Sequence, residues 1–416
     1  MKLSFKVLFI IIITSLSNSI LAQTDLLVLN KKEVKEVIYS VQNAIIANYV
    51  DLDLGKKMSE SLNTKNYYSI KNPNEFAQKL TNDLQFISKD KHLKLNFEPE
   101  RIAQNKIKTS LEDSLIAIQK QVKNMKRSNF GFLEQKILEG NIGYLDLRYF
   151  ADVEYAKETI EASMAFLANT NAIIIDLRQN GGGVPSSLKL LSSYFFNEKP
   201  VLLNTFYNRS TDETEEFLTE KNIKGKRLPK TSLYILTSRN TFSAAEAFAY
   251  NLKHLDRAII VGETTRGGAN RTKRIDIDTN FTVSMPYIKA IHPITKSNWE
   301  GIGVIPNIEI ASEDAFVKAY IEAINKTMGN HPMKNKILNK AGYDFLQDNN
   351  ILKAISIFKV NTELYKTDAN AWDSLGEAYL KNGEEENALK SYKKALALDP
   401  TSKSAKEMIQ KLENLH

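Results

Sequence analysis

The sequence predicts an α/β protein core flanked by two helical segments. From residue 141 onward, short apolar runs alternate with helical patterns, as expected of an α/β fold. Before that point apolar residues recur every three or four positions, which is typical of amphipathic helices. Residues 333–416 repeat with a period of about 34 residues, which indicates stacked helix pairs. The chain has 416 residues, enough for two or three domains.

The composition excludes several classes of protein. Hydrophobic residues make up 43% of the chain and charged residues 25%, which is too polar for a polytopic membrane protein. Because cysteine is absent, thiol nucleophiles, disulfides and iron–sulfur clusters are excluded. The net charge of +7 is spread along the chain without a long basic run, so we expect no nucleic-acid partner. No carboxylate or histidine cluster has ligand spacing, so no metal or organic cofactor is expected.

The first 22 residues have the pattern of a secretory signal. Lys2 and Lys6 precede an apolar run over 7–13, and small residues follow up to Ala22. An uncleaved anchor is the alternative, but the run falls short of the roughly 20 apolar residues that span a bilayer. Cleavage would leave a mature chain that starts near Gln23. Without a cysteine for lipid attachment, a periplasmic or secreted product is expected.

The N-terminal segment is predicted to be a small helical module. Residues 31–50 carry an apolar stripe at helical spacing, and a second stripe begins after Asn72. Residues 93–97 then alternate between apolar and polar side chains, which predicts a strand and places His92 at a helix-to-strand junction. Residues 100–127 are charged and weakly periodic, so they fit either a helix or a linker.

The core is predicted from its alternation of strands and helices. The expected strands cover 142–147, 172–177, 233–237 and 258–261, the helices between them 152–168, 185–196 and 243–254, and strands and turns fill 272–310. Beyond the core, the pattern from Trp372 to Pro400 fits the tetratricopeptide repeat template, and Leu338 to Phe358 form a weaker copy one period earlier. The alternative is an unrelated pair of helical hairpins.

Two turns of the core carry residues suited to chemistry. Gly181, Gly182 and Gly183 follow an apolar strand, and such a turn can direct backbone amides at an anion or an oxyanion. A tight turn with no other role explains the glycines equally well. Ser243 opens a predicted helix, where free amides and the helix dipole favour the negative charge of an acyl-transfer step. A helix cap is the structural alternative for this serine.

A serine nucleophile needs a base within hydrogen-bond reach. His254 lies on the same helix, roughly 16 Å further along at 1.5 Å per residue, and His331 and His416 lie outside the core. His92 and His292 both remain as candidates. The carboxylate that would orient the base can be any of four residues, namely Asp90, Glu246, Glu263 and Glu300.

Together the motifs resemble the C-terminal processing (tail-specific) serine peptidases, and most of all the branch of the tricorn core and interphotoreceptor retinoid-binding protein. The motifs are Asp90 to Leu93, Gly143 to Leu145, Asp176 to Gly183, Ser243 to Glu246, Gly262 to Gly268 and Glu300 to Pro306. The resemblance implies a ClpP/crotonase-like α/β peptidase core. It also implies Ser243 as nucleophile, His92 as general base and Glu300 as the acidic member of the relay. The amide of Ala244 and one from Gly182 or Gly183 match the oxyanion hole.

The chain departs from that family pattern at several positions. Lys91 stands where tricorn-type sites have a serine that bridges the histidine and the glutamate, so the link from Glu300 to His92 would run through water, Asp90 or another residue. Gly268 stands where the branch with a Ser–Lys dyad has its lysine, and Lys273 is a poor substitute. Arg266 and Arg271 nearby stay protonated and cannot act as bases. Between residues 97 and 141 the chain is too short for the PDZ domain of many relatives.

The sequence therefore predicts an exported serine peptidase that hydrolyses proteins or peptides through an acyl-enzyme. The alternatives are a non-hydrolytic binding protein on the same fold and a scaffold in which the repeats bind a protein partner or a second copy. The expected segments are a signal peptide (1–22), a helical module (23–98), a linker or helix (99–130), the peptidase core (131–312), a connecting helix (313–332) and two repeats with a closing helix (333–416).

Overall fold

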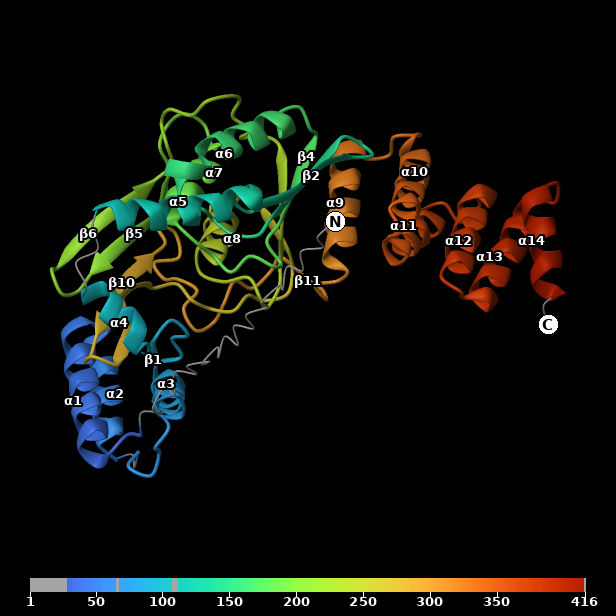
Figure 1. Ribbon diagram of the computed structural model, residues 1–416. Coiled ribbons are helices and arrows are strands. Elements are labelled where there is room, and N and C mark those ends of the chain that lie inside the picture. The colour runs from blue at the N-terminus through green and yellow to red at the C-terminus, as the bar shows by residue number, and fades with distance from the viewer. Residues whose placement is uncertain (1–27, 65–66, 107–110, 415–416) are drawn as a thin grey trace, which may run out of the picture.

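The computed structural model describes residues 28–64, 67–106 and 111–414. Figure 1 shows three parts in a row, with the N-terminal helices at one end, the α/β core in the middle and the helical repeats at the other end. The expected signal peptide lies outside the described residues. Within the described ranges, no helix combines the length and the apolar character needed to cross a membrane.

The N-terminal module consists of α1 (Lys31–Asn48), α2 (Leu52–Thr64) and α3 (Pro73–Ser88). Asn30 caps α1 in a reciprocal capping box with Glu33, and Asn72 caps α3, as the sequence predicts for α3. The buried faces of these helices share one apolar core with the strand residues Val283 and Met285. The module is therefore packed onto the α/β core. Helix α2 was not predicted from the sequence.

A mixed six-stranded sheet forms the centre of the core, with the strand order β11-β8-β7-β4-β3-β2. All neighbouring pairs are parallel except β2 with β3. The strands are β2 (Phe132–Leu138), β3 (Ile142–Leu147), β4 (Ala172–Asp176), β7 (Ser232–Thr237), β8 (Ile259–Gly262) and β11 (Ile308–Glu309). Ligands bind beyond the carboxyl ends of parallel strands, so the loops after β4, β7 and β8 mark the functional edge.

Helices cover both faces of this sheet. They are α6 (Val153–Leu167), α7 (Pro185–Ser193) and α8 (Ala244–His254) on one face and α9 (Ala315–Met328) on the other. Ile173 and Ile175 of β4 belong to the core with α6, α7 and α8, whereas Ile174 belongs to the core with α9. This alternation explains why residues 172–175 of β4 are apolar on both faces of the sheet.

A second, antiparallel sheet joins the N-terminal module to the core. Its order is β1-β10-β5-β6, with β9 also paired to β10. The strands are β1 (Lys94–Phe97), β5 (Leu202–Asn208), β6 (Glu213–Leu218), β9 (Arg271–Asp276) and β10 (Phe281–Ile291). The sequence did not predict β5 and β6. Four of the six residues of β6 are exposed, so this strand has no apolar alternation to detect.

Residues 99–106 and 111–127 form helices rather than an extended linker. Helix α4 covers Pro99–Lys106 and helix α5 covers Leu111–Arg127, followed by a 3-10 turn at Asn129–Gly131. Both described stretches are therefore helical, which is one of the two alternatives that the sequence left open.

The C-terminal part is entirely helical and extends away from the sheet (Figure 1). It contains α10 (Lys334–Gln347), α11 (Ile351–Leu364), α12 (Ala369–Lys381), α13 (Glu385–Leu398) and α14 (Lys403–Glu413). Leu338 of α10 and Ile357 of α11 belong to the same apolar core as α9 and the sheet. The predicted fold class, an α/β core with an N-terminal helical module and a C-terminal helical repeat segment, is confirmed.

Candidate active site

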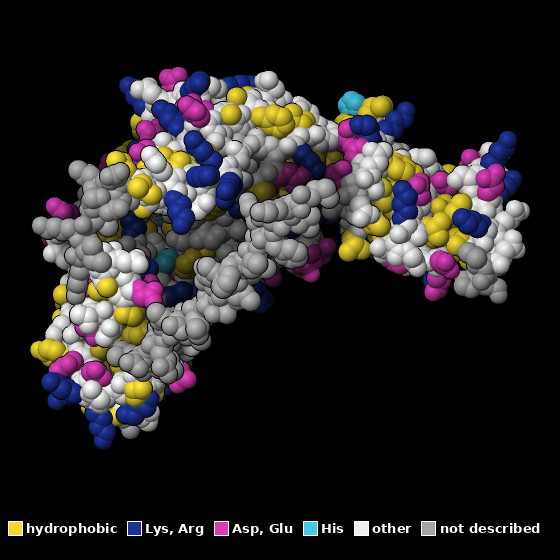
Figure 2. Space-filling view, in the orientation of Figure 1, with side chains coloured by type: hydrophobic (Ala, Val, Ile, Leu, Met, Phe, Trp, Pro, Cys, Tyr) yellow, Lys and Arg dark blue, Asp and Glu magenta, His cyan; other side chains and the backbone are white. Residues whose placement is uncertain are grey.

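One cavity brings together residues from three loops that lie far apart in the chain. Its volume is about 390 Å³, and Ser243, Ala244, Gly183 and His92 all line it. The glycine-rich loop follows β4, Ser243 follows β7, and His92 comes from the loop between α3 and β1. Figure 2 shows that this face of the molecule is hollowed between the N-terminal module and the core. The site is thus built jointly by the two parts.

Ser243 occupies a strained turn at the start of α8. Its backbone has φ 55° and ψ −119°, whereas an N-cap residue normally has an extended backbone. A positive φ at a non-glycine residue costs roughly 1–3 kcal/mol and persists only where the surroundings hold it in place. Here the Ser243 N–H donates to Glu246 Oε2 at 2.8 Å. A serine that only capped the helix would not need this conformation.

The glycine-rich loop lies directly against the serine turn. A Cβ atom at Gly182, where φ is +105°, would be 2.8 Å from Ser243 Cβ and 3.1 Å from the Ala244 nitrogen. Asn180 is fully buried and holds the loop, because its Nδ2 donates to the Leu147 carbonyl and its Oδ1 accepts from Gly182 N–H at 2.8 Å. The Gly182 N–H therefore already donates a hydrogen bond within the loop and is less available to a ligand.

His92 lines the same cavity in a largely desolvated position. Its ring packs against Phe242, the neighbour of Ser243, with ring centroids 4.5 Å apart. Burial lowers the pKa of His92 to about 4, and the positive charges of Lys94 and Arg266 act in the same direction. The imidazole is consequently neutral near pH 7 and available to accept a proton.

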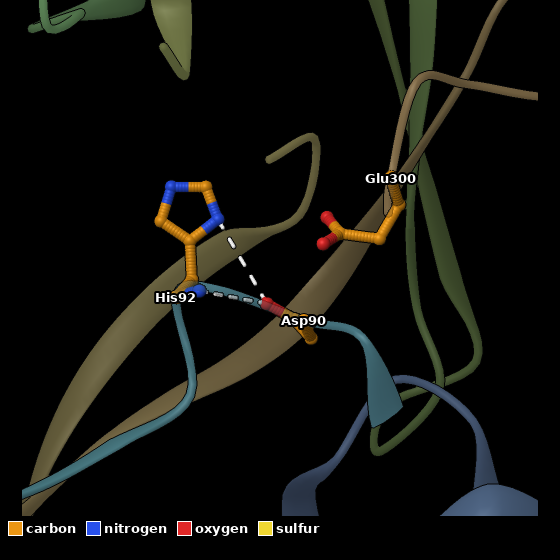
Figure 3. Close-up of side chains that lie close together, drawn as sticks. All are labelled: Asp90, His92 and Glu300. Carbon is orange, nitrogen blue, oxygen red and sulfur yellow. Dashed lines mark hydrogen bonds and ion pairs between the residues drawn. The ribbon is translucent and has the colours of Figure 1, made fainter. Parts of the chain in front are cut away.

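A buried and a half-buried carboxylate, Asp90 and Glu300, lie beside His92 (Figure 3). Asp90 Oδ1 accepts from His92 N–H at 3.0 Å and lies 4.0 Å from His92 Nδ1. Glu300 Oε2 accepts from the backbone amides of Ala269 at 2.6 Å and Asn270 at 3.0 Å. Asp90, His92 and Glu300 each offer one atom within 4.8 Å of the others. The structure therefore gives the histidine two acidic neighbours rather than one.

The two carboxylates perturb each other. Burial and the nearby charge of Asp90 raise the pKa of Glu300 to about 8, and burial also raises the pKa of Asp90. Like charges at this separation resist ionising together, so one proton is shared by the pair near neutral pH. Asn270 Nδ2 and Tyr49 Oη both donate to Asp90 Oδ2, which favours the charge on Asp90.

The same three side chains are the one group in the described ranges that comes close to metal-ligand geometry. Zinc lies about 2.0–2.2 Å from histidine and carboxylate ligands, so two such ligands are at most about 4.4 Å apart. The three atoms lie within 4.8 Å of one another, and one Glu300 oxygen already accepts two amide hydrogens, which makes it a poorer metal ligand.

Lys91 does not occupy a bridging position. Its side chain is turned towards the Arg266 carbonyl, to which the Nζ donates. The residue that lies next to the histidine ring is Asp90, one of the four carboxylates that the sequence left open. An acidic residue two positions before the histidine is the sequence pattern that indicates this arrangement.

Gly268 explains why a lysine dyad does not fit this site. A Cβ atom at position 268 would lie 2.7 Å from His92 Cε1 and 2.3 Å from Phe242 Cε2. Any side chain there would displace the histidine. Lys273 lies on β9, where its Nζ stacks on the Tyr287 ring at 4.9 Å.

The remaining candidates from the sequence, His292, Glu246 and Glu263, make packing, hydrogen-bond or ion-pair contacts that support the fold. His292 is fully buried between Tyr250 and His254 and does not line the cavity. Glu246 accepts from the amides of Ser243, Gly267 and Gly268, so it fixes the loop under His92. Glu263 forms an ion pair with the exposed Arg239 at 3.6 Å.

Comparison with known proteins identifies related sequences for all three parts. The model of peptidase family S41 matches residues 141–310, and that of the N-terminal domain of peptidase S41 in eukaryotic IRBP matches residues 17–129. A tetratricopeptide repeat model matches residues 369–402.

Two curated relatives are proteases. The tail-specific protease of Haemophilus influenzae is 32% identical over 97 residues, covering 23% of this chain and 13% of the relative. The carboxy-terminal processing protease CtpA of Bacillus subtilis is 23% identical over 240 residues, covering 55% of this chain and 50% of the relative. The matches thus span at most half the length of these relatives.

Solved structures with similar folds include a putative peptidase from Parabacteroides merdae and the tricorn protease. The first has a TM-score of 0.48 and 17% identity, covering 70% of this chain and 96% of that one. The second has a TM-score of 0.43 and 14% identity, covering 71% of this chain and 37% of that one. The family models thus identify a peptidase family S41 domain over residues 141–310, an IRBP-type N-terminal domain of that family over residues 17–129 and a tetratricopeptide repeat over residues 369–402.

Proposed function

We propose that the protein is a serine peptidase that hydrolyses peptide bonds through an acyl-enzyme on Ser243. The observation that carries the proposal is the cavity itself, which is lined by a strained serine, a neutral histidine and the residues Gly183 and Ala244. The match to the S41 peptidase family supports the same reaction class.

In the proposed reaction, His92 takes the hydroxyl proton of Ser243 as Oγ attacks the substrate carbonyl carbon. The carbonyl oxygen becomes an oxyanion, held by the Ala244 N–H and the Gly183 N–H. Gly183 is favoured over Gly182 because the Gly182 amide already donates to Asn180. The protonated His92 then gives its proton to the leaving amine as the C–N bond breaks. A water molecule, deprotonated by His92, cleaves the ester and restores Ser243.

We assign Asp90 the ionised position and Glu300 the protonated position beside the base, since each offers an oxygen within 4.8 Å of a His92 nitrogen. An ionised Asp90 would stabilise the imidazolium that forms during attack, in the manner of the acidic member of a triad. The distance of 4.0 Å from His92 Nδ1 is longer than a hydrogen bond, but such contacts shorten when substrate binds. This arrangement replaces the bridge that Lys91 cannot make.

The test is labelling with a fluorophosphonate probe together with peptide hydrolysis. Ser243→Ala should abolish labelling and lower kcat by about 10⁴ or more, because the nucleophile is lost while the fold keeps its Cβ. Ser356→Ala, in the repeats, is the matched control and should keep both signals. Labelling that persists in Ser243→Ala would refute the assignment. A wild-type protein that neither labels nor hydrolyses peptides would instead favour a binding protein on this fold.

We also propose that the protein is exported and matured by removal of the first 22 residues. The support is the sequence pattern of residues 1–22 alone. Intact-mass analysis of the protein from periplasmic and culture fractions should give a chain that starts near Gln23. Recovery of the full-length mass from the cytoplasmic fraction would contradict export.

A further inference from the structure

The cavity at Ser243 extends along α8 into a side pocket with apolar walls. Ala247 lies one helical turn after the nucleophile, and Leu188 of α7 with Phe206 and Phe217 of the β5–β6 pair completes the walls. The two phenylalanine rings meet edge to face with centroids 5.3 Å apart. These four residues define the side pocket. Small residues on α8 leave the space that the aromatic wall encloses.

One buried polar group interrupts this apolar lining. Asn204 of β5 also lines the cavity and is 1% exposed. Its Nδ2 donates to Asn251 Oδ1 at 2.9 Å, but its own Oδ1 has no partner, and neither has Asn251 Nδ2. Exchanging the oxygen and nitrogen of both amides leaves the same number of groups unpaired. A buried polar atom without a partner is costly, so a ligand that bonds Asn204 would relieve this cost.

Charge around the pocket disfavours a charged ligand. The Arg271 guanidinium lies 3.9 Å from the centre of the Phe206 ring and pairs with the exposed Glu215 only at 3.6 Å. It would repel a substrate lysine or arginine. An acidic side chain is disfavoured for another reason, because an ionised carboxylate has no proton to donate to the unpaired Asn204 Oδ1 and would be buried against it. The pocket therefore suits a neutral group.

The position of the side pocket next to Ser243 indicates which residue of a substrate would enter it. The residue whose carbonyl is attacked becomes covalently bound to Ser243, so its side chain (P1) is the substrate group nearest to Ala247. We propose that the side pocket selects a neutral P1 side chain that is apolar along its length and can form a hydrogen bond at its tip. This inference rests on the proposed function. Tyrosine matches best, because its ring packs on aromatic walls and its hydroxyl can donate to or accept from Asn204.

The experiment compares peptides that differ only at P1, with tyrosine, phenylalanine, alanine or lysine. We expect kcat/KM for tyrosine to exceed that for phenylalanine about tenfold, the effect of one neutral hydrogen bond, with lysine the poorest. The double variant Asn204→Leu/Asn251→Leu removes both amides and should bring the tyrosine-to-phenylalanine ratio to about one. Asn222→Leu, an exposed site after β6, should retain the ratio. Equal rates for tyrosine and phenylalanine in the wild type would overturn the proposal.

A second variant tests the pocket without changing the buried amides. Ala247→Leu should fill the space beside the nucleophile, so turnover of the tyrosine peptide should fall at least tenfold relative to the alanine peptide. An unchanged ratio of these two peptides would also overturn the proposal.

Binding separates this inference from the proposed function. N-acetyl-tyrosinamide and N-acetyl-phenylalaninamide are titrated into Ser243→Ala and followed by NMR chemical shifts. If Ser243→Ala prefers the tyrosine amide but the wild-type protein hydrolyses no peptide, the side-pocket proposal is supported and the proposed peptidase function is refuted. If the wild-type protein hydrolyses peptides but neither assay shows a preference for tyrosine over phenylalanine, the side-pocket proposal is refuted and the proposed peptidase function is retained.

Discussion

At the scale of single residues, the acidic pair beside His92 is the feature that distinguishes this site. Asp90 comes from the N-terminal module and is buried, whereas Glu300 comes from the far end of the core and is half-buried, and each offers an oxygen within 4.8 Å of a His92 nitrogen. Because burial and mutual repulsion keep one proton on the pair, the two carboxylates cannot have equal roles. The hydrogen bonds from Asn270 and Tyr49 favour Asp90 as the ionised member.

Two isosteric variants test this division of roles. Asp90→Asn should lower kcat by about 10²–10⁴, since the imidazolium loses its charged neighbour. Glu300→Gln should cost less than tenfold, because a glutamine oxygen can still accept from Ala269 and Asn270. Profiles of kcat/KM against pH should show a displaced acidic limb only for Asp90→Asn, which a merely structural role would not produce. The reverse order of effects would move the acidic role to Glu300.

The lowered pKa of His92 predicts how peptidase activity depends on pH. Protonation of the base ends activity, and burial places the pKa of His92 at about 4, so activity should persist well below pH 6.5. Lys94 contributes to this lowering through its positive charge. In Lys94→Ala the pKa of His92 should therefore rise, and the acidic limb of kcat/KM should move to higher pH.

Rate measurements between pH 4 and 8 would check the direction of that movement. Lys57→Ala, which removes a charge from α2 instead, is the control and should leave the acidic limb in place. A limb that moves to lower pH in Lys94→Ala would contradict the electrostatic explanation.

At the scale of elements, the loop after β8 determines which kind of base the site can hold. Glu246 fixes this loop through the amides of Gly267 and Gly268, and Gly268 packs directly under His92. Gly268→Ala should reduce kcat about a hundredfold, because displacing a catalytic group by about 1 Å has an effect of that size.

Gly55→Ala is the matched control for Gly268→Ala. Its added Cβ would meet neighbours no closer than 3.4 Å, within helix α2, so activity should be retained. Steady-state kinetics and circular dichroism together distinguish loss of the base from loss of the fold. Full activity in Gly268→Ala would show that His92 is not held in the position described.

Prediction from the sequence succeeded for elements with a clear periodicity and failed for those without one. The apolar strands β3, β4 and β7 and the capped helix α3 fall within a residue or two of their predicted positions. The β5–β6 pair was missed because the exposed, acidic residues of β6 carry no strand pattern. That missed pair supplies Asn204, Phe206 and Phe217, so the side pocket could not be predicted either.

At the scale of the whole molecule, the three parts are connected through shared apolar cores. The N-terminal module supplies His92 and Asp90 to the site, so the central domain by itself would lack the base. At the other end, Leu338 and Ile357 of the first repeat pack with α9 and the sheet. Docking of a partner or a second copy on the repeats stays a prediction.

Two truncations test how far the repeats support the core. Deletion of 333–416 exposes the outer face of α9 and should lower the thermal midpoint by roughly 5 °C or more, given about 2–4 °C per kcal/mol. Deletion of 366–416 leaves α10 and α11 in place and should lower it less. Differential scanning fluorimetry of both chains, with peptidase assays, would check this. Equal midpoints for wild type and the longer deletion would show that the first repeat is independent of the core.

The sequence by itself determined the fold class, the nucleophile candidate and the alternation that builds the sheet. These follow from periodicity and from local motifs, which neighbouring residues specify. Only the tertiary structure decided that His92 rather than His292 lines the cavity with Ser243, that Asp90 lies 4.0 Å from the His92 ring, and that Asn204 lines the same cavity. Such relations join residues far apart in the chain, and the packing that brings them together leaves no periodic trace in the sequence.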